Sequence, residues 1–293
     1  MKKTSKVAQI SILGKISGNV NADEVIGTRV ALKKMYSTTG EVLPFVSARA
    51  VKYSIRLALK DLGFEIDPFI TSKNPKDALR LADSGDPKKY IDNDIFGYMK
   101  TKGREERADT RQAPIALSYF KALRDTPIKA EFAARFPRDP NSDDNPVPFE
   151  VEVAEFIGRL NCIIYDYVGK DTQGKNIVDD KERENRIRSF SDVLLTPRYV
   201  LPRRTNSLCV PEYISALIVL SQNGVLPVYQ YLDYDFEKNR LNTEKLKLLV
   251  DIIGNDSTEL FFINYLGQSV EVPQKITVTT VGGAVEKITK FLV

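Results

Sequence analysis

The sequence predicts an α+β fold of split βαβ type that is interrupted by large insertions. Two observations carry this prediction: an alternating strand is followed by a strongly amphipathic helix, and further strands return after an irregular middle section. The 293 residues suffice for one large domain or two ordinary ones, and the composition is that of a soluble globular protein.

The first predicted element is a half-buried strand at about 7–18, because Ile10 and Ile12 alternate with Gln9 and Ser11. A polar, glycine-bounded loop or bulge is expected at 18–27, followed by a second strand or hairpin arm at 28–35. The alternation is unlike the apolar core of a signal peptide, and no apolar run approaches membrane-spanning length. We therefore expect a cytoplasmic protein without membrane contact.

The next element is a helix that begins after Ser47, a good N-cap residue, and ends near Gly63, a good C-terminal glycine. At about 100° per residue, its basic residues lie on one stripe and its apolar residues on the opposite stripe. The basic stripe contains no acid, which suits a polyanion backbone, although a solvated helix face explains it about equally well. The stripe consists of Arg49, Lys52, Arg56 and Lys60, with Tyr53 at its edge.

Charge and composition narrow the possible functions. Residues 1–60 contain eleven Lys and Arg against three Asp and Glu, a net charge of +8, so the rest of the chain carries −4. This asymmetry indicates an anionic partner for the N-terminal part. The absence of histidine excludes His-based catalysis and His-containing metal sites. Cys162 and Cys209 lie among apolar residues and are predicted to be reduced core side chains.

The remaining pattern predicts two insertions and the end of the fold. We expect a helical insertion at 68–100, a strand at 115–120, and a protruding, proline-punctuated loop or arm at 125–148. The expected later elements are strands at 149–153, 160–168, 207–221, 225–232, 259–265 and 275–281, helices at 179–195 and 243–253, and a terminal helix after 283.

Several blocks resemble a known family and occur in its order over most of the chain. They are Ile16-Ser-Gly-Asn-Val-Asn21, Leu43-Pro-Phe-Val-Ser-Ala-Arg-Ala-Val-Lys-Tyr-Ser-Ile-Arg56, Asp94-Ile-Phe-Gly-Tyr-Met99, Arg111-Gln-Ala-Pro-Ile-Ala-Leu-Ser118 and Asn145-Pro-Val-Pro-Phe-Glu-Val-Glu152. Together they are similar to the crRNA-binding backbone subunit (RAMP superfamily) of type I CRISPR Cascade complexes, most closely its DevR-type, subtype I-B-like branch.

The resemblance implies a hand-shaped molecule. Its palm would be a modified RRM or ferredoxin-like unit of residues 1–65 and 149–293, with a helical finger insertion and linker at 66–118 and a thumb at 119–148. Copies of the chain would oligomerise along crRNA, hold its phosphates, and present its bases for pairing with target DNA beside other Cascade subunits. This implies a non-catalytic role in antiviral defence, with no cofactor and no metal.

The resemblance also implies roles for single residues. Ser47, Arg49 and Lys52 match a helix that grips guide phosphates, with Arg56 extending the stripe. Other positions stay open: Tyr53 either stacks or packs, Phe132 either wedges between bases or packs in the thumb or on a neighbouring subunit, and charges on the second strand either contact RNA or are solvated. The further candidate RNA contacts are Arg29, Lys33, Arg111, Gln112, Arg203 and Arg204.

Two other functions compete with a scaffolding role. A metal-dependent RNA endonuclease of the CRISPR RAMP type would use a loop carboxylate, for which Asp109 is the best candidate. A DNA-binding autoregulator, which the DevR name implies, would bind duplex DNA, although the sequence has no helix-turn-helix signature.

Overall fold

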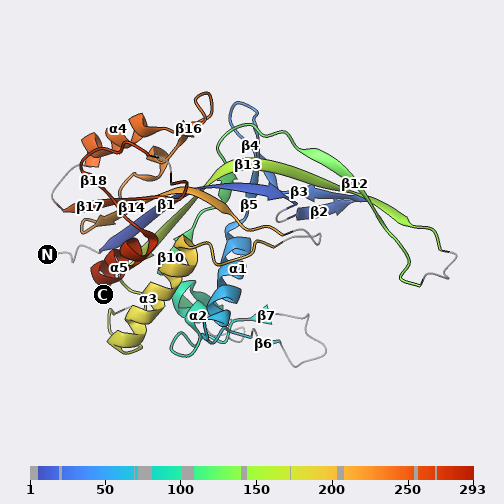
Figure 1. The fold of residues 1–293 in the computed structure, drawn as a ribbon. Coiled ribbons are helices and arrows are strands. Elements are labelled where there is room, and N and C mark those ends of the chain that lie inside the picture. Colours follow the sequence, from blue (N-terminus) through green and yellow to red (C-terminus); the bar gives the residue numbers. More distant parts are fainter. Residues whose placement is uncertain are drawn as a thin grey trace.

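The computed structural model describes residues 6–19, 22–68, 70–71, 81–100, 109–139, 144–171, 173–202, 208–253, 257–267 and 269–293. Within these residues, strands of one large mixed sheet alternate with helices (Figure 1). In chain order the elements are β1 (Val7–Gly18), β2 (Ala22–Ile26), β3 (Arg29–Leu32), β4 (Lys34–Tyr36), β5 (Val42–Val46), α1 (Ala48–Asp61), β6 (Ile70–Thr71), β7 (Leu81–Ala82), α2 (Ile91–Ile95), β8 (Tyr98–Lys100), β9 (Asp109–Arg111), β10 (Ile115–Leu117), β11 (Phe120–Ala122), β12 (Lys129–Arg135), β13 (Val147–Tyr165), α3 (Asp180–Leu195), β14 (Glu212–Ser221), η1 (Tyr229–Tyr231), β15 (Tyr234–Asp235), β16 (Arg240–Leu241), α4 (Thr243–Ile253), β17 (Thr258–Asn264), β18 (Ile276–Val278) and α5 (Val281–Leu292).

The main sheet has the strand order β18-β17-β14-β1-β13-β11-β5-β4. Its centre is antiparallel, since β1 pairs antiparallel with both β13 and β14, and β13 pairs antiparallel with β10 and β11. Parallel pairing occurs between β17 and β18 and between β13 and β3. The chain therefore returns to the centre of the sheet after α1 and again after α3, which is the α+β arrangement that the sequence predicts.

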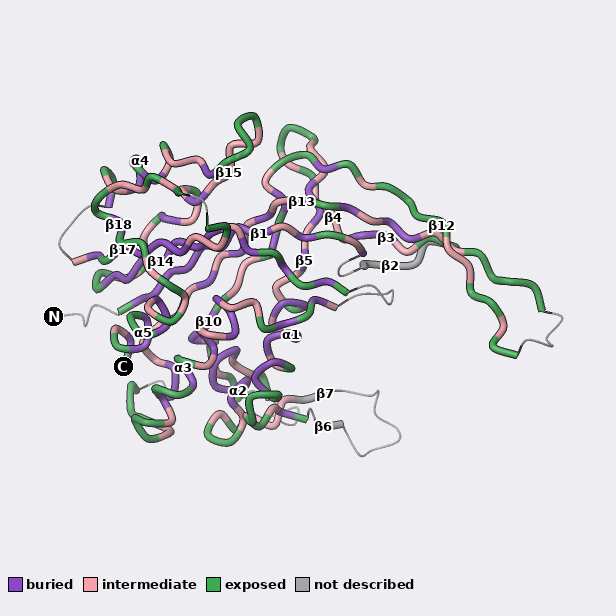
Figure 2. The backbone as a smooth tube through the Cα atoms, viewed as in Figure 1, coloured by how far each residue is buried: buried purple, intermediate pink, exposed green. Residues whose placement is uncertain are grey.

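One face of the sheet is covered by α1, α3 and α5 (Figure 1). Ile10 and Ile12 of β1 point to this face and are fully buried with Val51 of α1, Phe190 of α3 and Ile288 of α5. Figure 2 shows that the central strands β1 and β14 are buried along most of their length. The apolar positions of β1 face a large core on this side, but Gln9 and Ser11 are buried as well. The expectation of a half-buried strand is therefore wrong, because β1 is covered on both faces.

The opposite face is half covered by residues 222–253, which include η1 and α4 (Figure 1). Leu13 and Leu217 of the sheet are buried here against Leu246 and Leu249 of α4. The polar Gln9 is also fully buried, but its side-chain amide donates to the Leu226 carbonyl at 2.8 Å and accepts from the Leu226 amide at 2.7 Å. Its burial is therefore compensated.

A long arm projects from the sheet (Figure 1). It is a two-stranded ladder in which β12 pairs antiparallel with the first part of β13, from Lys129↔Val153 to Arg135↔Val147. Most of its outer part is exposed (Figure 2). The protruding arm expected at 125–148 is therefore confirmed, and it is built as a β-ribbon.

Several predicted elements agree with the structure and others are wrong. The strand at 7–18 and the helix at 243–253 are confirmed, and the helix at 179–195 differs only at its N-cap. Residues 225–232 contain η1 where a strand was expected, and 18–27 includes β2. The separate strands expected at 149–153 and 160–168 form a single strand, β13.

The insertion is less helical than expected. Its described part contains the five-residue α2 and the short pairs β6–β7 and β8–β9, while residues 72–80 of the expected helical insertion lie outside the described residues. Both cysteines are buried and neither forms a disulfide bond within the described part of the chain, as predicted. In the described part of the chain, no helix has the length and apolar character needed to cross a membrane.

Candidate nucleic-acid interface

Helix α1 is well capped at both ends. The Ser47 hydroxyl accepts a hydrogen bond from the Ala50 amide at 3.2 Å, as the sequence predicts. At the other end Gly63 has φ +93°, and the Phe64 amide donates to the Leu59 carbonyl at 3.1 Å, closing a Schellman turn. The buried stripe of α1 fixes its rotation on the sheet, so the basic stripe has a defined orientation.

The exposed part of α1 contains two of the four predicted cations. Arg49 and Lys60 are exposed, and neither has an ion-pair partner among the described residues. Tyr53 is 54% exposed and Leu57 46% exposed on the same side. Arg49 lies in the first turn, where unpaired backbone N–H groups and the helix dipole also favour an anion.

The other two cations are packed against the insertion. Nζ of Lys52 lies 5.1 Å from the ring centroid of Phe96, and Cζ of Arg56 lies 5.1 Å from the same centroid. Nε of Arg56 donates to Asp92 at 3.0 Å, and Asp92 is buried. Burial, followed by repulsion from Arg56, lowers the pKa of Lys52 below 10.5. Arg56 is therefore committed within the fold, which corrects its expected place on an open stripe.

Lys33 and Arg29, the other basic candidates before α1, lie in different places, and only Lys33 is near the start of that helix. The Lys33 carbonyl accepts a hydrogen bond from the Phe45 amide at 3.0 Å, two residues before the Ser47 cap. Lys33 is half-buried. Arg29 begins β3 at the root of the arm and forms an ion pair with Glu150 of β13, with 2.6 Å between Nη2 and Oε2. Arg29 is thus neutralised within the chain, although about half of its side chain is exposed.

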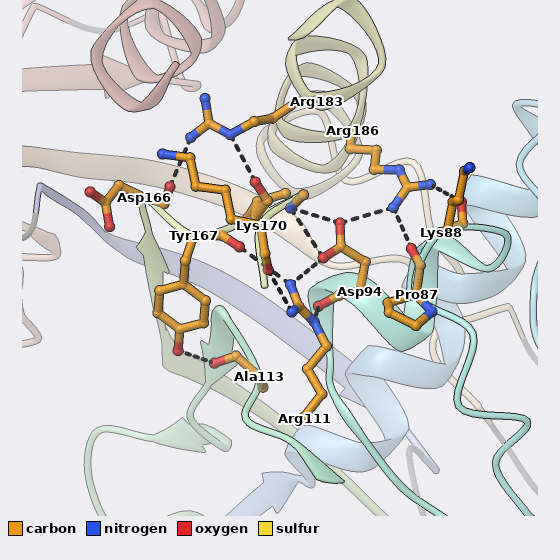
Figure 3. A network of polar contacts seen from close by, with 12 residues as sticks. Pro87, Lys88, Asp94, Arg111, Ala113, Asp166, Tyr167, Lys170, Arg183 and Arg186 are labelled. Atoms are coloured by element: carbon orange, nitrogen blue, oxygen red, sulfur yellow. Dashed lines mark hydrogen bonds and ion pairs between the residues drawn. The ribbon is translucent and has the colours of Figure 1, made fainter. Parts of the chain in front are cut away.

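Arg111 lies in the interior (Figure 3). Its guanidinium donates to the carboxylate of Asp94, to the Asp94 carbonyl at 3.0 Å and to the Lys170 carbonyl at 2.7 Å. Its side chain is only 8% exposed. The expectation of an RNA contact through this side chain is corrected: Arg111 joins the insertion to the end of β13.

Sequence reasoning missed Asp94 and Arg186, which hold this junction together with Arg111. Asp94 is fully buried and also accepts hydrogen bonds from Arg186 of α3 at 3.0 Å and from the Gly169 amide at 3.0 Å (Figure 3). We call Asp94, Arg111 and Arg186 the Asp94 cluster. The available signal was three polar residues, Asp92-Asn93-Asp94, between Ile91 and Ile95 in a segment expected to be helical.

The other candidate residues fall into three groups. Gln112 and Phe132 are exposed. The side chain of Phe132 is 73% exposed, so it does not pack on the described residues of the arm. Arg203 and Arg204 lie outside the described residues. Asp109 is exposed with the Tyr98 hydroxyl 3.5 Å away, and the described residues hold no cluster of three His, Cys, Asp or Glu suited to a metal ion.

Comparisons with known proteins agree with this architecture. Two chains of solved structures align with nearly the whole molecule. One, described as a CRISPR RNA-guided surveillance complex, has a TM-score of 0.66 at 10% identity and covers 97% of this chain and 98% of its own. The other, a CRISPR RNA-guided surveillance complex in a pre-nicking state, has a TM-score of 0.67 at 9% identity over 98% and 100%. The fold is thus that of chains found in CRISPR surveillance complexes.

The sequence match is more specific. Residues 17–239 match the family described as CRISPR-associated negative auto-regulator DevR/Csa2, and the chain belongs to that family. The resemblance drawn from the sequence blocks is therefore confirmed at the level of the family. A search of curated proteins finds no match.

Proposed function

We propose that this protein is a non-catalytic backbone subunit of a CRISPR surveillance complex, which oligomerises along crRNA and holds its phosphates. Membership in the DevR/Csa2 family and the fold shared with surveillance-complex chains support this proposal. Its partners would be crRNA, further copies of the chain, other Cascade subunits, and target DNA through base pairing. Residues 1–65 and 149–293 would form the RRM-like palm, residues 66–118 the finger insertion and linker, and residues 119–148 the thumb.

The proposal depends mainly on the positive charge that the structure places at the start of α1. A capped helix N-terminus, the exposed Arg49 and the partly exposed Lys52 lie next to the chain segment that carries Lys33. Neither Arg49 nor Lys52 forms an ion pair with a described carboxylate. Backbone N–H groups and such cations suit phosphate oxygens, which carry most of the sequence-independent affinity for nucleic acid.

Charge reversal tests the proposal. The variant Arg49→Glu/Lys52→Glu should lose stable binding of crRNA at low salt while keeping its far-UV circular dichroism spectrum. The matched control is Lys275→Glu/Lys287→Glu, which makes the same charge change at two exposed residues, Lys275 just before β18 and Lys287 on α5. Equal affinities of the two variants would contradict the proposal.

Salt dependence gives a second, quantitative readout. For single-stranded nucleic acid, each neutralised phosphate contributes about 0.7 to the slope of log K against log salt. The neutral variant Arg49→Gln/Lys52→Gln should therefore reduce the magnitude of that slope by about 1.4. A weaker affinity with an unchanged slope would indicate that the two side chains do not contact phosphates.

The family description favours one alternative, a DNA-binding autoregulator. That function predicts that the protein free of RNA shifts duplex promoter DNA in a gel. Neither RNase treatment nor a defect in crRNA binding should abolish that shift. Cleavage of complementary RNA by the purified complex with a divalent metal would instead support an endonuclease and contradict the non-catalytic role.

A further inference from the structure

The half of the second sheet face that α4 leaves open has an unusual composition. Residues paired across neighbouring strands point to the same side of a sheet. A row of such pairs runs from Phe45 on β5 through Lys121 on β11 and Arg159 on β13 to Leu13 on β1. Leu13 lies in the core beneath residues 222–253, whereas Lys121 is exposed. The row therefore passes from the open half of the face to the covered half.

An aromatic pair lies at the open end of this row. The rings of Phe45 and Tyr119 are stacked with centroids 4.9 Å apart, and Tyr119 is 50% exposed. The pairing of β13 with its neighbours shifts by one residue between Leu117↔Cys162 and Lys121↔Arg159, as in a β-bulge. Because a bulge re-aims side chains, it accounts for an exposed ring beside the buried Phe120.

Two cations lie near the pair, while Glu155 and Glu212, which line the same pocket as Arg124, both form ion pairs with Lys15. Lys121 and Arg124 are exposed, and neither forms an ion pair with a described residue. The Arg124 guanidinium lies 3.9 Å from the ring centroid of Phe236, which holds it at the border with the α4 side. The nearest acid along the chain, Asp125, accepts a hydrogen bond from the Val42 amide at 2.7 Å. We call Phe45, Tyr119 and Lys121 the aromatic platform.

We propose that the aromatic platform is a second contact for a single strand of nucleic acid, on which a base stacks against Tyr119 while Lys121 contacts a phosphate. An exposed, supported aromatic ring beside unpaired cations is the combination that binds single strands without sequence preference. Protein–protein interfaces are depleted in lysine, whereas Lys121 is exposed here without an ion pair among the described residues, so a polyanion is the better complement. The proposal goes beyond the phosphate contacts of α1, because none of its residues belongs to that helix.

The chain contains no tryptophan, so a single reporter can be introduced. In the full-length Tyr119→Trp variant, adding a short oligouridylate should quench the tryptophan fluorescence through base stacking. The quenching should persist in the Arg49→Glu/Lys52→Glu background at higher concentrations and should weaken with Lys121→Glu. The control Lys275→Glu should leave it unchanged.

A ring-specific series gives the size of the effect. Tyr119→Phe should keep the affinity for the oligouridylate, whereas Tyr119→Leu should lower it roughly tenfold, because a leucine side chain cannot stack on a base. Absence of quenching when anisotropy shows the oligonucleotide to be bound would overturn the proposal. The proposal would also be overturned if the introduced tryptophan were shielded from solvent in the assembled complex and remained shielded after RNase treatment. That result would assign the platform to a protein partner. If only the α1 variants gave the unexpected result, by binding crRNA as well as their control, the proposed function would be refuted and this inference would stand.

Discussion

Replacing Asp94 by asparagine should destabilise the free protein strongly, because the carboxylate is the shared acceptor of two buried guanidinium groups. Arg111 and Arg186 both donate to it, the latter at 3.0 Å, and Asp94 is fully buried. Removing one partner of a buried ion pair costs about 3–5 kcal/mol. Each arginine keeps carbonyl acceptors, such as those of Lys170 and Pro87. We therefore expect about 3 kcal/mol, at the lower end of that range.

The assay is urea and thermal unfolding followed by far-UV circular dichroism. With about 2.1 cal/mol/K of unfolding entropy per residue, a loss of about 3 kcal/mol in this chain lowers the melting temperature by roughly 5 °C. The matched control is Asp251→Asn on the exposed side of α4, which should change the free energy of unfolding by less than about 0.5 kcal/mol.

One result would refute this reasoning. If Asp94→Asn and Asp251→Asn unfolded at the same urea concentration, Arg111 would not be a structural residue. If Arg111→Gln then weakened RNA binding without loss of stability, the original expectation of an RNA contact at Arg111 would be restored.

Three further predictions follow from local geometry. Gly97→Ala should be strongly destabilising, visible as a lower melting temperature, because Gly97 has φ +71° and a Cβ would overlap the Arg111 carbonyl oxygen; a melting temperature equal to wild type would contradict this. The pKa of Lys52 is lowered in the folded protein, so the unfolded state holds that proton more tightly. The free energy of unfolding of the wild type relative to Lys52→Met should therefore rise with pH between the lowered pKa and 10.5. Urea titrations in which this difference in free energy stays flat or falls with pH would exclude the prediction. Phe132→Ser should leave the free energy of unfolding within about 0.5 kcal/mol of wild type, because Phe132 is 73% exposed, and a larger loss would show that its ring packs on the arm.

Local pattern was sufficient for several elements of the fold. The alternation of β1 and the capping residues Ser47 and Gly63 of α1 depend on neighbouring residues only, so they could be predicted from sequence. The arm could be placed for the same reason, since its prolines and charges exclude a core. The failures at 225–232 and in the insertion occur where short segments depend on what they pack against.

By itself, the sequence determined the fold class, the family, the orientation of the α1 stripe and the accumulation of positive charge near the N-terminus. Only the tertiary structure decided which of those charges are available. Asp92 and Asp94 come from the insertion, well beyond the end of α1 along the chain, yet one neutralises Arg56 and the other Arg111. The pairing of β5 with β11 likewise brings Phe45 against Tyr119. Such contacts join residues far apart in sequence, and their cost in chain entropy is offset only when the whole core forms, so no local pattern predicts them.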